Sequence, residues 1–140
     1  MNLHRTLLTL ATLTLCTPAL ADRYEALPSG VVVTHLVQGK GEAPTAKSTV
    51  KVHYRGTLTN GTEFDSSYRR NAPISFALNQ VIPCWTQGVQ RMRVGGKAKL
   101  TCPATAAYGA RGVPGVIPPD SVLMFEIELL AIEKPRFGLF

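Results

Sequence analysis

Hydrophobic and polar residues alternate along several short stretches of this chain, a pattern typical of strands with one buried face. The clearest case is residues 49–58, where Val50, Val52 and Tyr54 share one face and charged side chains occupy the other. The same strand character recurs at residues 31–37, 74–78, 97–102 and 121–132.

One stretch follows helical spacing instead. Trp85, the only tryptophan, is followed at i+4 and i+7 by Val89 and Met92, so the three side chains share one helical face. Pro83 precedes them, and proline is favoured in the first turn of a helix because its missing N–H would be unpaired there. We expect a helix from 83 to 94 whose apolar face covers a sheet.

Two connections complete the predicted architecture. Asn60-Gly61 is a strong hairpin signal, so residues 62–65 are expected to return beside the strand at 49–58. Residues 103–120 form a long loop rich in proline and glycine, and loops of this length are usually functional. The predicted fold is α+β, with an antiparallel sheet of five or six strands half-wrapped around one short helix.

The N-terminus has the features of a signal peptide. Arg5 precedes an apolar stretch at 7–15, and Ala19-Leu20-Ala21 fits a small-x-small cleavage site. The stretch is short and rich in threonine, so we expect no stable membrane insertion after cleavage. The alternative is that Cys16 is lipidated. Export to the periplasm is expected, with full secretion as the alternative.

These features divide the chain into four parts. They are a signal peptide at 1–21, a short polar lead-in at 22–30, a folded domain at 31–134 and a tail at 135–140.

The charge of the chain is basic but dispersed. Removing Arg5 from the 15 basic residues leaves 14 against 9 acidic ones, a net charge of +5. Such a balance can indicate a nucleic-acid partner. No aromatic residues are interleaved with the basic ones as base stacking would need, and an exported protein rarely meets nucleic acid. We therefore expect a solvated basic surface and no nucleic-acid partner.

Two cysteines remain after cleavage, Cys84 and Cys102. Their separation of 18 positions fits neither a CxxC redox motif nor a metal-ligand array. In an oxidising compartment such a pair usually forms a disulfide. The alternative is that Cys84 stays free, with a pKa lowered by its position in the first turn of a helix, and reacts.

Other common chemistries lack their motifs. There is no nucleophile-elbow serine, and the glycines of the loop at 103–120 lack the Lys-Ser/Thr ending of a phosphate loop. We expect neither a metal nor a cofactor. What remains is an apolar pocket with a few polar groups at the mouth of the core, near Val81, Ile82 and Trp85.

Several separate stretches in this order resemble the FKBP-type peptidyl-prolyl cis-trans isomerases, over about residues 31–132. They are Val52-His53-Tyr54-Arg55-Gly56, Gly61-Thr62-Glu63-Phe64-Asp65-Ser66-Ser67, Val81-Ile82-Pro83-Cys84-Trp85, Ala106-Ala107-Tyr108-Gly109, Ile117-Pro118-Pro119 and 123–130. Within the family the chain is most similar to the exported bacterial branch and to the catalytic domain of macrophage infectivity potentiators. The helical dimerisation region of those proteins is not expected here, so a monomer is predicted.

The resemblance implies a role for individual residues. Trp85 matches the pocket floor, Tyr108 the tyrosine whose hydroxyl binds a substrate or macrolide carbonyl, and Asp65 the aspartate facing the twisting amide. The N–H of Ile82 matches a second anchor for the peptide. The remaining wall and loop positions implied for substrate binding are Tyr54, Phe64, Val81, Phe125, Val116 and Ile117.

The chain departs from the family pattern at three positions. Ile74 stands where many relatives have an aromatic pocket residue, and Val113 replaces a frequent histidine in the overhanging loop. Both affect the expected substrate preference and macrolide affinity. Cys84 takes a position often held by glycine, and related exported proteins imply that it bridges to Cys102.

The activity implied is acceleration of X-Pro bond rotation in proline-containing polypeptides, inhibited by macrolides of the FKBP class. A dry apolar pocket would favour the twisted amide over the planar one, with no covalent step. The alternative is a non-catalytic chaperone or proline-segment binding module on the same fold.

Overall fold

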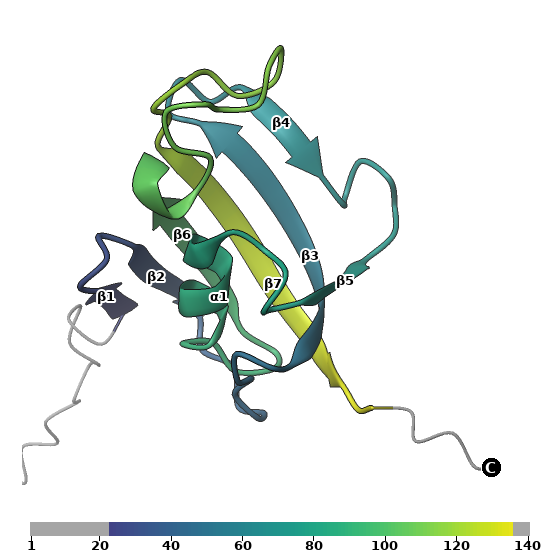
Figure 1. Cartoon of the computed structure of the whole chain (residues 1–140). Helices are drawn as coiled ribbons and strands as arrows, with labels where there is room; N and C mark the ends of the chain where they lie inside the picture. The colour runs from purple at the N-terminus through teal and green to yellow at the C-terminus, as the bar shows by residue number, and fades with distance from the viewer. Residues whose placement is uncertain (1–22, 136–140) are drawn as a thin grey trace, which may run out of the picture.

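The computed structural model describes residues 23–135; the predicted signal peptide, Cys16 and residues 136–140 lie outside this range. Within it, seven strands and one α-helix follow one another along the chain (Figure 1). The elements are β1 (Tyr24–Ala26), β2 (Val32–Val37), β3 (Thr49–Leu58), β4 (Glu63–Ser66), β5 (Ile74–Ala77), α1 (Pro83–Val89), β6 (Lys97–Cys102), a 3-10 helix (Ala104–Ala106) and β7 (Leu123–Glu133).

The strands form one antiparallel sheet in the order β1-β2-β6-β7-β3-β4, with β5 also paired to β3. The two longest strands, β3 and β7, lie side by side at its centre and pair from Thr49↔Glu133 to Leu58↔Leu123 (Figure 1). The α+β class is confirmed. The described residues form seven strands where five or six were expected.

The additional strand is β1, inside the segment predicted to be a lead-in. β1 pairs with β2 in the register Tyr24↔Thr34. The next residue of β1, Glu25, adds a side-chain contact between the two strands: its Oε2 lies 2.9 Å from Nε2 of the buried His35. Three residues are too few for an alternation pattern to indicate a strand, so this pairing depends on tertiary contacts.

The predicted hairpin forms between β3 and β4, with a turn slightly different from the one expected. Within this turn only Gly61 has a positive φ, at 86°, whereas the expected turn needs a positive φ at both Asn60 and Gly61. Its N–H donates to Leu58 O at 2.9 Å, and the side chain of Asn60 accepts the Thr62 N–H at 3.0 Å. These contacts fit a three-residue loop with glycine in the left-handed position, which is the next most common hairpin connection.

Helix α1 is shorter than predicted and ends at Val89. The chain continues in a tighter turn, where the Met92 N–H donates to the carbonyl three residues earlier, Val89 O, at 3.0 Å. Met92 nevertheless stays in the core, because it still lies on the buried face. Gly95 has a φ of 89°, but its N–H donates to Leu129 O and so joins the turn to β7 instead of capping the helix.

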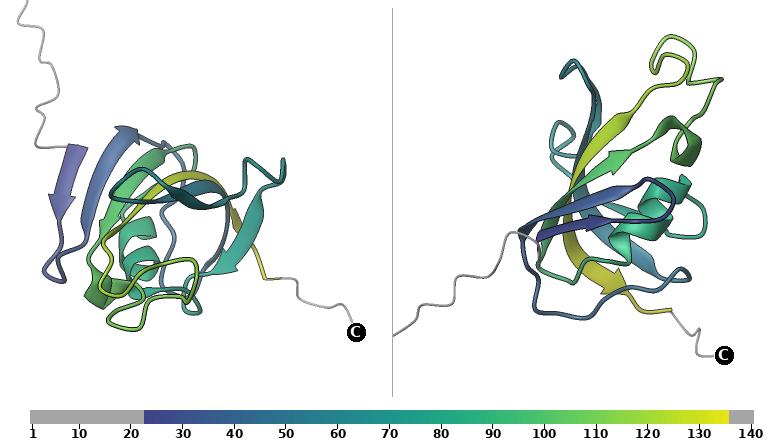
Figure 2. Two further views of the ribbon diagram at one scale, coloured as in Figure 1. Left: turned by 90° about the horizontal axis from the view of Figure 1, so that it is seen from above. Right: turned by 90° about the vertical axis from the view of Figure 1, so that its left-hand side faces the viewer.

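The sheet curls around α1, as the view from above shows (Figure 2). Close packing of the helix on β6 depends on Gly88, since a Cβ there would lie 2.7 Å from both methyl groups of Leu100. The core between helix and sheet contains Val33, Val50, Val52, Leu78, Val89, Leu100, Leu123, Ile127 and Leu129. Its open end, near Trp85, is where the aromatic residues gather.

Candidate active site

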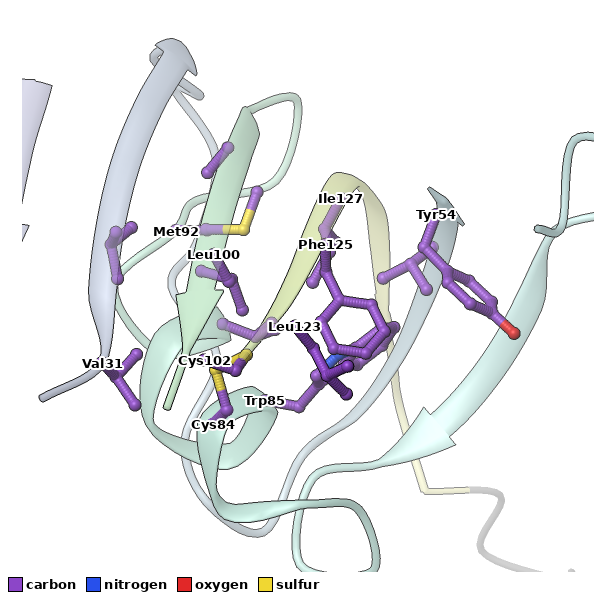
Figure 3. Packing of buried hydrophobic residues seen from close by; sticks show 14 of the residues in the cluster. Val31, Tyr54, Cys84, Trp85, Met92, Leu100, Cys102, Leu123, Phe125 and Ile127 are labelled. Atoms are coloured by element: carbon purple, nitrogen blue, oxygen red, sulfur yellow. A yellow bond between two sulfur atoms is a disulfide. The ribbon is translucent and has the colours of Figure 1, made fainter. Parts of the chain in front are cut away.

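Trp85 forms the centre of the aromatic cluster. It lies in the first turn of α1, with only 4% of its surface exposed. The rings of Phe76, Tyr54 and Phe125 meet it edge to face, with centroids 5.1, 5.2 and 5.4 Å away. Edge-to-face pairs contribute stability beyond their buried area, so three of them hold the indole in one orientation. Figure 3 shows Trp85 and Phe125 packed against each other next to the start of the helix.

The cluster opens into a pocket of about 510 Å³. The residues lining it are Tyr54, Phe64, Asp65, Phe76, Gln80, Val81, Ile82, Trp85, Tyr108 and Phe125. They come from β3, β4, β5, β7, α1, the loop before α1 and the loop after the 3-10 helix. A pocket of this size, mainly aromatic with a few polar groups, is typical of a ligand site.

Most residues that the sequence implicated lie in this lining, but three do not. Val116 is 49% exposed, and Ile117 is buried in the loop, where it exchanges backbone hydrogen bonds of 2.9 and 2.8 Å with Val113. Ile74 is also absent from the lining. The position of β5 that lines the pocket is two residues further along the strand.

Phe76 is the residue at that position, and it was missed. Ile74 and Phe76 lie on the same face of β5, because residues two apart in a strand point the same way. Phe76 lines the pocket, and its ring contacts both Trp85 and Tyr54. β5 therefore contributes an aromatic ring to the pocket lining, although the resemblance had pointed to Ile74 on this strand. A sequence signal existed, since Phe76 is the only aromatic residue in the stretch 74–78.

A polar network lies against the aromatic wall. The Tyr54 hydroxyl donates to Asp65 Oδ2, and Arg70 Nη1 donates to Asp65 Oδ1 at 2.8 Å. Arg70 Nη2 also donates to the Tyr54 hydroxyl oxygen at 3.1 Å, which closes a three-membered arrangement. The N–H of Ser66 adds a fourth hydrogen bond, to Asp65 Oδ1 at 2.9 Å. Arg70, on the loop between β4 and β5, was not among the predicted site residues.

This network keeps Asp65 ionised. Partial burial by itself raises the pKa of Asp65. The hydrogen bonds from Tyr54 and Arg70 together lower it by more than burial raises it, so the pKa lies below its ordinary value. Burial, followed by the hydrogen bond to Asp65, raises the pKa of the Tyr54 hydroxyl. At neutral pH the pocket wall therefore carries a carboxylate, not a proton donor.

The segment before α1 is held firmly at the pocket edge. Ile82 precedes the helix with extended backbone angles, and its carbonyl accepts the N–H groups of Trp85 and Thr86 at 3.0 and 3.2 Å. The hydroxyl of Thr86 donates to Leu78 O at 2.5 Å, which connects the helix back to the end of β5. Proline at the first helical position favours this geometry, as the sequence predicted.

The disulfide between Cys84 and Cys102 is present, as predicted, so Cys84 is not a free thiol. Both cysteines are fully buried. The bond connects the first turn of α1 to the end of β6, next to Trp85 (Figure 3). It therefore joins the pocket floor to the strand that leads into the loop carrying Tyr108.

Tyr108 lies on the rim, 42% exposed, in the loop that follows the 3-10 helix. Backbone hydrogen bonds shape this loop on both sides of it: the Gly109 N–H donates to Ala104 O at 2.8 Å and the Gly112 N–H to Tyr108 O at 3.0 Å. Gly109 and Gly112 both have positive φ, at 57° and 61°. The glycines thus let the loop fold back and present the tyrosine at the pocket mouth.

None of the helices between residues 23 and 135 is long and apolar enough to span a membrane.

Comparison with known proteins places these features in a family. The model of FKBP-type peptidyl-prolyl cis-trans isomerases matches residues 40–130. FkpA, an isomerase of this type from Aeromonas hydrophila, is 59% identical over 97 residues, or 69% of this chain and 36% of the relative. FK506-binding protein 1 of Dictyostelium discoideum is 50% identical over 106 residues, or 74% of this chain and 99% of the relative.

A solved structure agrees with both relatives. The crystal structure of a peptidyl-prolyl cis-trans isomerase from Pseudomonas syringae superposes with a TM-score of 0.75 at 38% identity, covering 82% of this chain and 88% of that one. The similarity to FkpA confirms the predicted bacterial branch. This chain spans little more than a third of the length of that relative.

Proposed function

Because the chain belongs to the family of FKBP-type peptidyl-prolyl cis-trans isomerases, we propose that it accelerates the rotation of X-Pro bonds in proline-containing polypeptides. The observation that carries this proposal is the pocket above Trp85. Its walls are aromatic, and its one carboxylate, Asp65, is held in place by Tyr54 and Arg70.

The physics of the X-Pro bond explains why such a pocket is sufficient. The C–N bond has partial double-bond character, so rotation meets a barrier of about 18–20 kcal/mol. Twisting the amide breaks this resonance and moves charge off the oxygen, which makes the amide less polar. A pocket that excludes water therefore binds the twisted amide better than the planar one, and stronger binding of the transition state is catalysis.

The magnitude required is moderate. Lowering the barrier by about 7 kcal/mol gives a gain in rate of roughly 10⁵-fold. Desolvation and a few aimed dipoles are able to supply this amount without a covalent intermediate.

Each polar group has a distinct task in this mechanism. Asp65, ionised and fixed by its hydrogen bonds, supplies an oriented field next to the twisting amide and transfers no proton. The Tyr108 hydroxyl donates to a substrate carbonyl from the rim. The N–H of Ile82, in the lining just before α1, serves as a second anchor for the peptide.

The same pocket is proposed to bind macrolides of the FKBP inhibitor class. The name of the Dictyostelium relative, FK506-binding protein 1, supports this. So does the aromatic wall, which Phe76 completes in this chain. Val113 remains the position in the overhanging loop where the chain departs from the family pattern, and it is the first position to vary if macrolide affinity is low.

Location and assembly belong to the proposal as well. The features of residues 1–21 support export, and the disulfide fits an oxidising compartment such as the periplasm. A monomer is proposed for the mature chain, which light scattering on the purified protein tests directly.

The decisive experiment measures the cis-to-trans rate of a short peptide with leucine before proline, with and without a macrolide. Residues 22–140 should accelerate the reaction, and the macrolide should abolish the effect. Asp65→Asn removes the charge behind the oriented field, and Tyr108→Phe removes a hydrogen bond to the substrate carbonyl. Each should lower kcat/KM about tenfold. Tyr68→Phe is the matched control, since its hydroxyl donates to Glu128 and does not line the pocket.

Acceleration that the macrolide leaves untouched would place the activity outside this pocket. A folded protein without any acceleration would favour the alternative of a binding module for proline-containing segments.

A further inference from the structure

We propose that Gln80 is a further substrate-binding residue, whose side-chain carboxamide hydrogen-bonds a main-chain amide of the bound polypeptide beside the proline. This inference rests on the proposed isomerase function and adds to it a contact that the twisted-amide mechanism does not require. Gln80 lies on the loop between β5 and α1 and lines the pocket.

The inference begins with the polar groups of the pocket lining. Asp65 and the Tyr54 hydroxyl are bonded to each other and to Arg70. Besides the indole N–H of Trp85 on the pocket floor, the lining has two other polar side chains, Gln80 and Tyr108. Within residues 23–135, neither side chain forms a hydrogen bond. Both groups are therefore available to a bound molecule, and of the two only Tyr108 already has a task.

The backbone that carries Gln80 is well fixed. Its own N–H donates to Ala77 O at 3.0 Å, which closes a turn at the end of β5. The hydrogen bond from the Thr86 hydroxyl to Leu78 O, in the same turn, connects this loop to α1. The side chain itself is exposed. Binding a ligand therefore orders the side chain alone and requires no rearrangement of the loop.

The chemistry of a carboxamide suits a polypeptide main chain. It offers an accepting oxygen and two donating hydrogens, so it can pair with the N–H and the C=O of one peptide unit. Gln80 also lies two residues before Ile82, whose N–H is the proposed main-chain anchor. An extended peptide held at Ile82 runs along the same rim, where successive residues are about 3.3 Å apart. Gln80 thus lies beside the residue adjacent to the X-Pro unit and pairs with its main chain.

Because the carboxamide is uncharged, it accepts any residue type at this position. Replacing it by a carboxylate would change the preference. Gln80→Glu would put a second negative group on the lining, whereas the charge of Asp65 is already paired with Arg70. Peptides with lysine next to the X-Pro unit would then bind better than peptides with glutamate there, and salt would weaken this preference.

The test compares Gln80→Ala, Gln80→Glu and the control Asn79→Ala, which alters the neighbouring exposed residue outside the lining. For each protein, KM and kcat are measured with peptides carrying alanine, lysine or glutamate beside the Leu-Pro unit. Gln80→Ala should raise KM about three- to tenfold and leave kcat unchanged, the effect of losing one neutral hydrogen bond in the bound state. Gln80→Glu should favour the lysine peptide, and Asn79→Ala should behave as wild type.

The outcomes separate this inference from the proposed function. An active wild type together with unchanged KM in Gln80→Ala overturns the role of Gln80 while the isomerase assignment stands. If the wild type does not accelerate rotation, the proposed function fails. The role of Gln80 is then judged from peptide dissociation constants, measured by the fluorescence of Trp85. Equal constants for wild type and Gln80→Ala would overturn it, and a three- to tenfold difference would support it.

Discussion

The disulfide between Cys84 and Cys102 allows a quantitative prediction about stability. Replacing both cysteines by alanine removes a cross-link between residues that are 18 positions apart. In the chain-entropy model, closing a loop of this length lowers the entropy of the unfolded chain enough to stabilise the fold by about 3 kcal/mol. Both side chains are fully buried, so the loss of two sulfur atoms adds about 1 kcal/mol for the space left behind.

The expected total is about 4 kcal/mol, which a domain with ordinary stability of about 5–15 kcal/mol survives. The assay is equilibrium unfolding in urea, followed by the fluorescence of Trp85. The midpoint should fall, and the slope m should rise because the unfolded chain without a cross-link exposes more surface. In thermal unfolding the melting temperature should decrease by roughly 12–20 °C.

Catalysis should be less affected than stability. The disulfide joins the start of α1 to β6, but the rings of Tyr54, Phe76 and Phe125 hold Trp85 independently. Well below its melting temperature, the double variant should keep kcat/KM within about threefold of the wild type, since the edge-to-face contacts remain.

Wild-type protein treated with a reductant is the matched control. It loses the cross-link but keeps both sulfur atoms, so its midpoint should lie slightly above that of the double variant. Two results would refute the reasoning. One is a variant whose free energy of unfolding lies within about 1 kcal/mol of the wild type, well below what the loop model requires. The other is wild-type protein that, unfolded without reductant, reacts with a thiol reagent at both cysteines.

Two further predictions concern packing and charge. Gly88→Ala should destabilise the fold by about 1–3 kcal/mol in urea unfolding, because the added Cβ would lie 2.7 Å from the buried methyl groups of Leu100. The exposed control Arg91→Ala should change the free energy of unfolding by no more than about 0.5 kcal/mol. Equal effects of the two substitutions would contradict the packing argument. The lowered pKa of Asp65 means that its ionised form stabilises the fold above the ordinary carboxyl pKa and that this stability is lost as the pH falls through the lowered value. The stability advantage of wild type over Asp65→Asn should therefore be constant near neutral pH, stay at about 1 kcal/mol or less because the side chain is 40% exposed, and shrink below about pH 4. A stability advantage of wild type that grows as the pH falls would contradict this argument.

Local patterns in the sequence were sufficient for much of the fold. The alternation in 49–58 predicted β3, because a strand with one buried face must place apolar side chains at every second position. Pro83 with the spacing of Trp85 and Val89 predicted the start of α1. These elements depend on residues close together in the chain, so their signal is present in any short window.

The sequence also determined much of the candidate site, for a different reason. The motifs that match the family, from Tyr54 to Phe125, lie in separate stretches, and the structure brings these side chains together around Trp85. The resemblance supplied this arrangement. Without it, each aromatic residue would have been compatible with ordinary core packing.

Only the tertiary structure decided the remainder. It placed Phe76 in the pocket wall where Ile74 was expected, and it brought Arg70 and Gln80 to the site from loops without any pattern of their own. Which side chain of a strand reaches a pocket depends on how far along the sheet the strand is paired. The position of a loop residue depends on the elements at both of its ends. Both are set by contacts between distant parts of the chain, which a short stretch of sequence does not contain.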